Sequence, residues 1–181
     1  LVDIDPKMTE LARNNEIIVG VNDSSMFNPK MDVINLDAFN YLEGTEKIFD
    51  VIIADFPDPR NSELSRLYSM EFYSIVKKHL SEDGIFITQA CSPYFAPKVY
   101  ECIDTTIAAV GFGTLKLRNH VPTMGEWGFI LASKQLKTEE LENRFLTIKV
   151  DESKTKWINN NVLKALISFG KTHTDPAFKP G

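Results

Sequence analysis

One continuous apolar run constrains the fold of this chain more than any other stretch of its sequence. Phe49-Asp50-Val51-Ile52-Ile53-Ala54 is rich in β-branched residues. Such a run is typical of a strand that is buried on both faces of a parallel sheet. Asp55-Phe56-Pro57-Asp58-Pro59 then ends the strand at once, because its prolines restrict the backbone.

Helical and strand patterns alternate around this run. Asp5 can cap a helix with Pro6 at its first position and with Met8, Leu11 and Ala12 on one face. Strands that alternate with longer helices indicate an α/β doubly wound sheet, and two final strands joined by a turn indicate an antiparallel hairpin at one edge. Further strands are expected at 31–35, 84–89, 114–119 and 127–133, and further helical segments at 37–42, 69–80, 96–110, 137–144 and 157–169. Asp83-Gly84 is the turn signal that is expected to stop the helix at 69–80.

The chain begins with the segment Leu1 to Pro6, which is typical of the end of a buried strand that enters a helix. A buried strand needs neighbours on both of its edges. We therefore expect the chain to be a piece of a longer protein, with further elements on the N-terminal side of Leu1.

The composition excludes several classes of protein. There are 20 Lys and Arg residues and 25 Asp and Glu residues, and the net charge of −5 suits a small cationic substrate rather than nucleic acid. The longest uncharged run, 84–97, holds fourteen residues, whereas a membrane-spanning helix needs about 20. Cys91 and Cys102 are too few for a disulfide framework, which favours a reducing compartment. The three histidines are scattered without metal-ligand spacing, so no metal is expected.

Three acidic residues follow predicted strands: Asp3, Asp37 and Asp55. Ligands of an open parallel sheet bind outside the carboxyl ends of its strands, where an acid typically accepts hydrogen bonds from ribose hydroxyls. The alternative is that these acids cap the helices that follow. We favour that alternative for Asp5, because Pro6 comes after it, and both roles stay open for Asp3.

Asp55 and Asp58 form a more specific pattern, because prolines hold both carboxylates in one rigid loop. Paired carboxylates suit an amine substrate: one can hold an ammonium group while the other accepts a proton from the reacting nitrogen. The alternative is a tight polar loop in which Asp58 is a turn residue.

The segment Gln89 to Phe95 follows the next strand and offers an amide, a hydroxyl and two aromatic side chains to the same rim. Cys91 lies within it and has two interpretations, a nucleophile or a packed thiol. We favour the packed thiol, because no histidine lies near it in the sequence.

Together these motifs resemble the spermidine synthase family, the polyamine aminopropyltransferases. The resemblance covers roughly residues 1–133, and several motifs recur in the family's order. They are Val2-Asp3-Ile4-Asp5-Pro6, Leu36-Asp37-Ala38-Phe39, Asp50-Val51-Ile52-Ile53-Ala54-Asp55 with Asp58-Pro59, Leu67-Tyr68, Glu71-Phe72-Tyr73, Gln89 with Ser92-Pro93-Tyr94-Phe95, and Pro122-Thr123 leading into Gly128-Phe129.

The resemblance implies a Rossmann-like doubly wound sheet of the type found in S-adenosylmethionine-dependent methyltransferases. Residues 1–135 are then a partial catalytic domain that lacks the family's Gly-rich loop, and residues 136–181 are a C-terminal helical appendage and tail. A fragment without that loop is expected to be inactive by itself. The motifs look most like those of a bacterial subgroup whose parent chains carry transmembrane helices, so a cytoplasmic domain of a membrane-anchored parent and a homodimer are further expectations.

The resemblance also implies roles for individual residues. The reaction is aminopropyl transfer from decarboxylated S-adenosylmethionine to a diamine such as putrescine. Asp3 is then expected to hold the ribose, and Asp37 with Ala38 the adenine edge. Asp55 is expected to be the general base and Asp58 the anchor of the amine. Gln89 and Tyr94 are expected to line the amine site.

One departure leaves the acceptor amine open. Met124 stands where the family commonly has a tyrosine that contacts the amine. Two alternative functions therefore remain: an S-adenosylmethionine-dependent methyltransferase of a small molecule, and a catalytically inactive module that binds polyamines or nucleosides.

Overall fold

The computed structural model describes residues 1–169 and divides the chain into two compact units, residues 1–47 (unit 1) and 48–181 (unit 2). Their strands form two sheets, β1-β2 in unit 1 and β3-β4-β6-β5 in unit 2. The predicted boundary between residues 135 and 136 stays a prediction, and the predicted extended tail at 173–181 lies outside the described residues.

Unit 1 holds a short parallel pair of strands, in which Val2 is in register with Ile34. The predicted first helix is present, and its start has a local cause: the Asp5 side chain accepts a hydrogen bond from the Lys7 amide, with Pro6 in the first turn. Its elements are β1 (Val2–Asp3), α1 (Pro6–Asn14), α2 (Glu16–Val21), η1 (Ser25–Phe27), β2 (Ile34–Asn35) and α3 (Ala38–Gly44).

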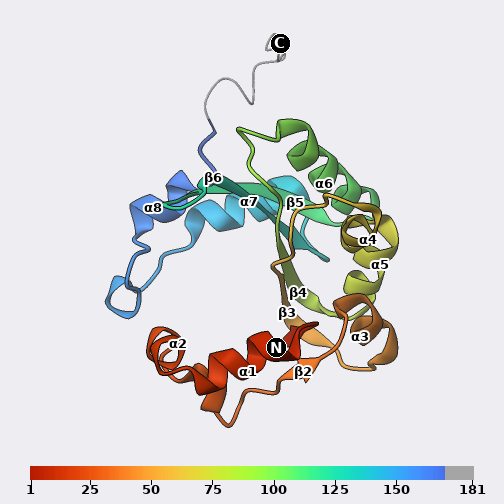
Figure 1. The fold of residues 1–181 in the computed structure, drawn as a ribbon. Helices are drawn as coiled ribbons and strands as arrows, with labels where there is room; N and C mark the ends of the chain where they lie inside the picture. The colour runs from red at the N-terminus through yellow and green to blue at the C-terminus, as the bar shows by residue number, and fades with distance from the viewer. Residues whose placement is uncertain (170–181) are drawn as a thin grey trace. The chain divides into compact units, whose positions relative to one another are not determined.

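Unit 2 is built on a mixed sheet (Figure 1). The apolar run forms β3 (Phe49–Ala54), which pairs in parallel with β4 (Leu80–Gln89). On its other side, β4 pairs antiparallel with β6 (Gly125–Ser133), which pairs antiparallel with β5 (Gly113–Val121). The predicted α/β class and the hairpin at one edge of the sheet are therefore confirmed.

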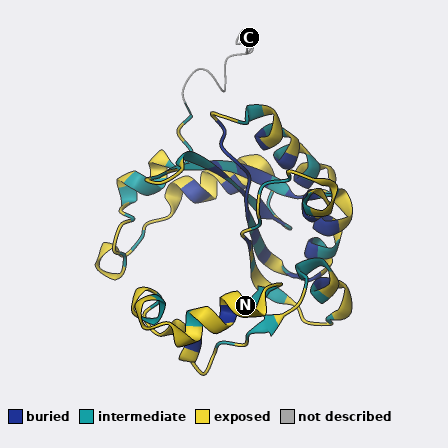
Figure 2. Cartoon of the chain, viewed as in Figure 1, coloured by how far each residue is buried: buried dark blue, intermediate teal, exposed yellow. Residues whose placement is uncertain are grey.

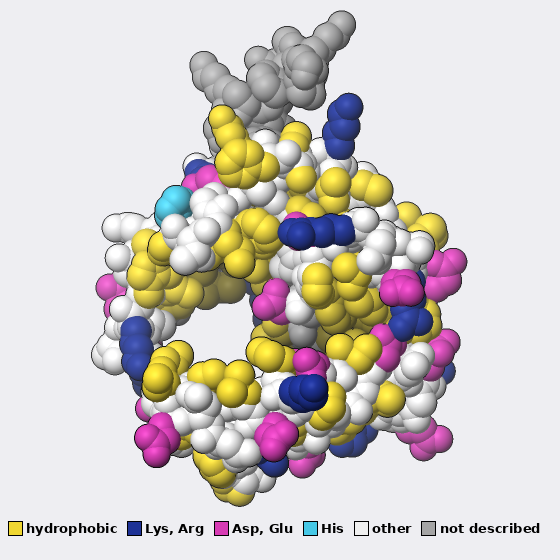
Figure 3. Space-filling view, in the orientation of Figure 1, with side chains coloured by type: hydrophobic (Ala, Val, Ile, Leu, Met, Phe, Trp, Pro, Cys, Tyr) yellow, Lys and Arg dark blue, Asp and Glu magenta, His cyan; other side chains and the backbone are white. Residues whose placement is uncertain are grey.

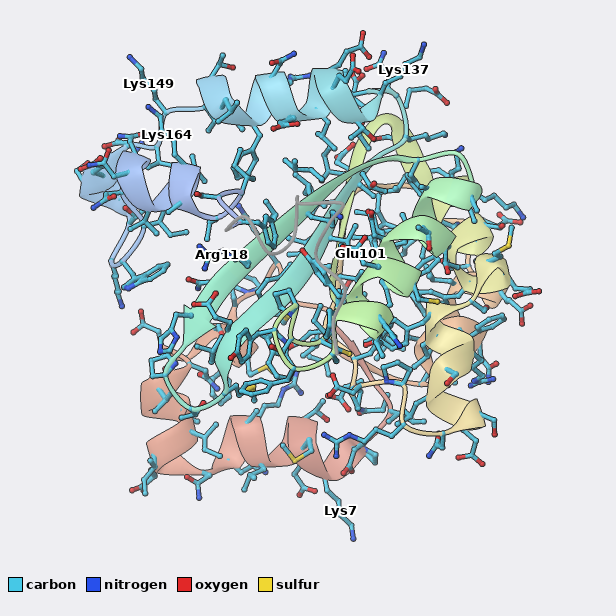
Figure 4. All side chains as sticks on the ribbon, turned by 90° about the horizontal axis from the view of Figure 1, so that it is seen from above. Lys7, Glu101, Arg118, Lys137, Lys149 and Lys164 are labelled. Carbon is cyan, nitrogen blue, oxygen red and sulfur yellow. The ribbon has the colours of Figure 1, made fainter. Side chains whose placement is uncertain are left out.

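Helices cover both faces of this sheet. Figure 4 shows α6, which carries the labelled Glu101, on one side of the β5–β6 hairpin and α7 and α8 on the other. Alternate residues of β5 account for this arrangement: Leu115 and Leu117 join a buried cluster with Phe145 of α7, whereas Lys116 forms an ion pair with Glu101 over 2.9 Å. The helical elements of unit 2 are α4 (Ser62–Ser65), η2 (Arg66–Tyr68), α5 (Met70–Lys78), α6 (Pro97–Ala109), α7 (Thr138–Thr147), η3 (Glu152–Lys154) and α8 (Asn160–Ala165).

The core of unit 2 lies between β4 and the helices α5 and α6. Phe86 of β4 is fully buried and packs against Tyr73 of α5, with ring centroids 5.8 Å apart. Phe72 packs against Tyr73 and extends this aromatic cluster to Phe56 in the loop after β3; the ring centroids of Phe72 and Phe56 are 5.5 Å apart. The core thus reaches the loop that carries Asp55 and Asp58.

The prediction that β3 is buried on both faces is wrong. Val51 is 57% exposed and Ile53 is 74% exposed, while Ala54 is buried. Figure 2 shows the buried residues of unit 2 in dark blue, along the sheet and on the helices α5 and α6. Ile53 pairs with Ile87, whose side chain packs against the cluster that α7 forms with β5, so Val51 and Ile53 lie on the same face of the sheet as α7. The reason for their exposure is that α7 packs on β5, whereas β3 lies at the opposite end of the sheet. A β-branched run stabilises a strand whether one or both of its faces are covered.

Two further details differ from the sequence predictions. Met8 and Leu11, expected on one face of α1, are both exposed, and the buried residue of this helix is Thr9. Figure 3 shows hydrophobic side chains at the surface of unit 1. Asp83 and Gly84 were expected to end the helix that begins near residue 69, but α5 ends at Lys78 and both residues lie inside β4.

The short strand β2 and the helix α2 also differ from expectation. β2 covers only part of the strand expected at 31–35, and the sequence analysis had no helix at α2. Among residues 1–169, no helix is long and apolar enough to span a membrane.

Candidate active site

The loop that follows β3 carries the paired carboxylates at the carboxyl end of the strand. Asp55 is exposed, and Asp58 is partly buried, with 24% of its side chain accessible. Between them, the Phe56 ring packs edge-on against Tyr68 and Phe72. This apolar anchor and the flanking prolines hold the loop in one place, as the sequence analysis expected of a platform for acid–base chemistry.

Gln89, the last residue of β4, ties this loop to the sheet. Its Nε2 donates to the Phe56 carbonyl oxygen over 2.6 Å and lies 3.4 Å from Oδ1 of Asp58. Its Oε1 accepts from the Cys91 amide over 2.9 Å and from Nε1 of Trp127 over 3.2 Å. Both ends of the buried amide are therefore engaged, which fixes its orientation.

Tyr68 also contacts the loop and stabilises it. Its hydroxyl accepts a hydrogen bond from Nε2 of Gln89 and donates to the carbonyl oxygens of Phe56 and Pro57, each over 3.2 Å. Burial, and to a lesser extent the negative charges of Asp58 and Asp55, raises the pKa of Tyr68 above its usual range. The phenol is consequently a permanent hydrogen-bond donor at neutral pH.

Cys91 also contacts the loop. Its Sγ donates to Oδ1 of Asp58 over 3.3 Å. Burial, together with the neighbouring Asp58, raises the pKa of Cys91 to about 12. A protonated thiol is a poor nucleophile, so the geometry supports the packed-thiol interpretation of this residue.

The outer oxygen of Asp58 faces a cation. Nη2 of Arg60, whose side chain is 80% exposed, lies 3.7 Å from Oδ2 of Asp58. The pair shows that this oxygen can be approached by a positively charged group from the solvent side.

Tyr94, predicted to line the amine site, lies at the surface instead of in the hydrogen-bonded network around Gln89. It is 73% exposed and packs edge-on against Phe95, with ring centroids 5.0 Å apart. The turn that carries it is closed by Oγ of Ser92, which accepts from the Tyr94 and Phe95 amides. The structure thus brings Asp58 and Gln89 together, with Asp55 in the same loop, and leaves the role of Tyr94 a prediction.

In unit 1, Asp3 is the last residue of β1, and Asp37 follows the carboxyl end of β2, the parallel strand beside it. Oδ1 of Asp3 accepts from the Asp5 amide over 2.8 Å. Oδ1 of Asp37 accepts from the Asn40 amide over 3.1 Å and so caps α3, whose first residue is Ala38. The helix-capping alternative therefore applies to Asp37.

Two residues of the network were not predicted as site residues. Tyr68 lies in the Leu67-Tyr68 motif, and Trp127 is the first residue of the strand expected at 127–133. The signal for both was an aromatic residue with a polar group next to a predicted motif. Within residues 1–169, no group of three or more His, Cys, Asp or Glu side chains could hold a metal ion.

Comparison with known proteins relates these residues to one family. The family model described as "Spermine/spermidine synthase domain" matches residues 1–143. A polyamine aminopropyltransferase of Oceanobacillus iheyensis is 40% identical over 171 residues, which are 94% of this chain and 32% of that protein. Polyamine aminopropyltransferase 2 of Ralstonia nicotianae is 44% identical over 133 residues, or 74% of this chain and 26% of that protein. The chain thus spans about a third or less of the length of these relatives.

The fold has solved counterparts as well. A crystal structure of spermidine synthase in complex with the transition-state analogue AdoDATO superposes with a TM-score of 0.75 at 22% identity. The match covers 94% of this chain and 58% of that one. Spermidine synthase from Thermotoga maritima gives a TM-score of 0.71 at 21% identity. At this identity the likeness establishes the fold.

Proposed function

Because the chain belongs to the spermine/spermidine synthase domain family, we propose that it takes part in aminopropyl transfer to a diamine such as putrescine. The donor is decarboxylated S-adenosylmethionine. The observation that carries the proposal is the loop after β3, in which two carboxylates share one rigid platform held by Gln89 and Tyr68. Relatives that are named polyamine aminopropyltransferases support it.

In this proposal Asp58 anchors the amine. One ammonium group of the diamine takes the position at Oδ2 that Arg60 now faces. A charge-assisted hydrogen bond there fixes the far end of the substrate. Gln89 and Tyr68 keep the loop in place, which holds the reacting nitrogen near Asp55.

Asp55 is the general base. An ammonium group has no lone pair, so the reacting end of the diamine must lose a proton before it attacks, and Asp55 accepts that proton. The nitrogen then forms a bond to the aminopropyl carbon next to the sulfonium, while the carbon–sulfur bond breaks and its electron pair returns to sulfur. A neutral thioether nucleoside leaves, and the positive charge of the sulfonium makes it a good leaving group.

Unit 1 supplies the nucleoside contacts in this proposal. Asp3 accepts hydrogen bonds from the ribose hydroxyls with the oxygen that does not bind the Asp5 amide. Asp37 and Ala38, at the start of α3, contact the adenine edge.

The test compares donors in the full protein encoded by the gene. We expect product formation from putrescine with decarboxylated S-adenosylmethionine and none with S-adenosylmethionine. Asp55→Asn should lower kcat at least about 100-fold while the diamine still binds by calorimetry, because a general base contributes about 10²–10⁴-fold. Asp83→Asn, an exposed acid at the start of β4, is the matched control and should leave kcat unchanged.

Three outcomes would contradict parts of the proposal. Undiminished turnover in Asp55→Asn would remove Asp55 from the base role. Methyl transfer from S-adenosylmethionine would favour the methyltransferase alternative. Binding of polyamines or nucleosides without turnover of either donor would favour the inactive binding module.

A further inference from the structure

Cys91 has no part in the chemistry described above, yet its backbone has an uncommon conformation that two hydrogen bonds hold in place. Its φ of +63° lies in the left-handed region, which non-glycine residues seldom adopt. The Gly128 amide donates to its carbonyl oxygen over 2.7 Å, and its own amide donates to Oε1 of Gln89 over 2.9 Å. Residues in such strained conformations cluster at functional sites.

With the backbone in this conformation, the Cys91 thiol points toward Oδ1 of Asp58. Sγ of Cys91 lies 3.3 Å from Oδ1 of Asp58, and the side chain of Cys91 is buried, with the residue only 4% exposed. Nε2 of Gln89 approaches the same oxygen at 3.4 Å. Two interior donors therefore share Oδ1, and the solvent side of the carboxylate is left to Oδ2.

We propose that Cys91 is a positioning residue, whose thiol holds Oδ1 of Asp58 so that Oδ2 is presented to the substrate ammonium. This inference rests on the proposed function, in which Asp58 anchors the amine. Without the thiol donor, the carboxylate is free to rotate about its Cβ–Cγ bond and is held from the interior only by the long contact to Gln89.

The choice of a thiol has a chemical reason. A sulfhydryl group is a weak donor, so it orients a carboxylate while it withdraws little of its negative charge. Cys91 thus combines a fixed direction with a carboxylate that still binds a cation.

The first arm of the test examines the contact itself and does not depend on activity. Cys102→Ala removes the other cysteine of these 181 residues, and mass spectrometry of the tryptic peptide that contains Cys91 follows the alkylation of this thiol alone. In this background, adding Asp58→Asn should accelerate alkylation of Cys91 by iodoacetamide at pH 8.5 at least about threefold, because loss of the neighbouring charge raises the thiolate fraction. An unchanged rate would overturn the contact.

The second arm examines positioning in the full protein. Cys91→Ala keeps a Cβ atom and so the same backbone strain, but it removes the donor. We expect it to raise the KM for the diamine about fivefold, or about 1 kcal/mol, with kcat within about twofold, as for the loss of one ordinary hydrogen bond that acts in binding. Cys91→Ser, which restores a donor, should stay within about twofold of the wild-type KM. Cys102→Ala, an exposed cysteine on α6, is the control and should match wild type.

The outcomes separate this inference from the proposed function. A wild-type KM in Cys91→Ala, or a KM in Cys91→Ser as high as that in Cys91→Ala, would overturn the positioning role. A wild-type protein that transfers no aminopropyl group would overturn the proposed function and the amine role of Asp58, even if alkylation responds to Asp58→Asn.

Discussion

Gly128 lies so close to Cys91 that no side chain fits between them. A Cβ atom on Gly128 would lie 2.8 Å from the Cys91 carbonyl oxygen and 2.5 Å from Cε2 of Tyr100. The absence of that atom lets β6 and the segment after β4 approach each other, and the approach fixes the backbone of Cys91 next to the acidic loop.

Gly128→Ala should therefore destabilise unit 2. Overpacking at a site where backbone is the near neighbour costs about 1–3 kcal/mol. Amide hydrogen exchange measures this, because it reports the free energy of opening in each unit separately. The control is Gly20→Ala in α2, where a new Cβ atom meets nothing within 4 Å. Gly20→Ala should stabilise α2 by about 0.5–1 kcal/mol. If both variants lost the same free energy of opening, the steric explanation for Gly128 would be contradicted.

Two buried tyrosines should respond in opposite ways to removal of their hydroxyl groups. The Tyr73 hydroxyl is buried and has no hydrogen-bond partner, whereas the Tyr100 hydroxyl donates to the Leu117 carbonyl oxygen over 2.9 Å. Tyr73→Phe should leave the free energy of unfolding unchanged or raise it by about 1 kcal/mol, and Tyr100→Phe should lower it by about 1 kcal/mol. Urea denaturation followed by tryptophan fluorescence measures both. A larger loss in Tyr73→Phe than in Tyr100→Phe would be inconsistent with these contacts.

Stability should fall in alkaline solution in a way that depends on Cys91. Folding raises the pKa of this thiol from about 9 to about 12, so between these pH values the unfolded chain loses a proton that the folded chain retains. This contribution is fully present below pH 9 and is lost as the pH rises toward 12. The free energy of unfolding in urea with a reductant, measured from pH 7 to 10, should therefore fall less steeply in Cys91→Ala than in wild type. Parallel curves for the two proteins would show that the thiol makes no such contribution, and Cys102→Ala provides the reference slope.

Arg60→Ala should strengthen diamine binding if Asp58 is the amine anchor. The Arg60 guanidinium faces the oxygen that the ammonium is proposed to take, and it must leave when the substrate arrives. Because an exposed ion pair contributes about 0–1 kcal/mol, the Kd should fall by up to about fivefold at low salt and by less at 0.5 M salt. Calorimetry with putrescine in both buffers measures the change; a weaker affinity in Arg60→Ala would indicate that the arginine helps to bind the ligand.

Much of the fold was predictable because the local signals agreed with one another. The cap at Asp5, the β-branched run at 49–54 and the hairpin strands were read correctly, since each rests on short-range chemistry. The exposure of Val51 was not predictable, because it depends on the place of β3 in the sheet order. The end of α5 was missed for a similar reason. Leu80 pairs with Phe49 of β3 and so becomes the first residue of β4. The strand therefore includes Asp83 and Gly84, which were expected to form a turn.

The candidate site shows the same division. Asp55 and Asp58 were found from their spacing and the flanking prolines, which are properties of one short segment. The contact of Cys91 with that segment and the contact of Trp127 with Gln89 could not be predicted, because 33 residues separate Cys91 from Asp58 and 38 separate Trp127 from Gln89. Only the folded sheet brings these residues together.

The bond between Trp127 and Gln89 has a consequence for the order of folding. Trp127 belongs to a hairpin that closes over the short turn at 122–124, so β5 and β6 can pair early at little entropic cost. Gln89, however, reaches both Trp127 and the loop after β3, and it lies between them in the sheet. The bonds of Gln89 to the acidic loop and to Trp127 can form together only after β4 has docked between β3 and the hairpin. A chain arrested before that step would hold much of its secondary structure and would lack this link between the loop and the hairpin.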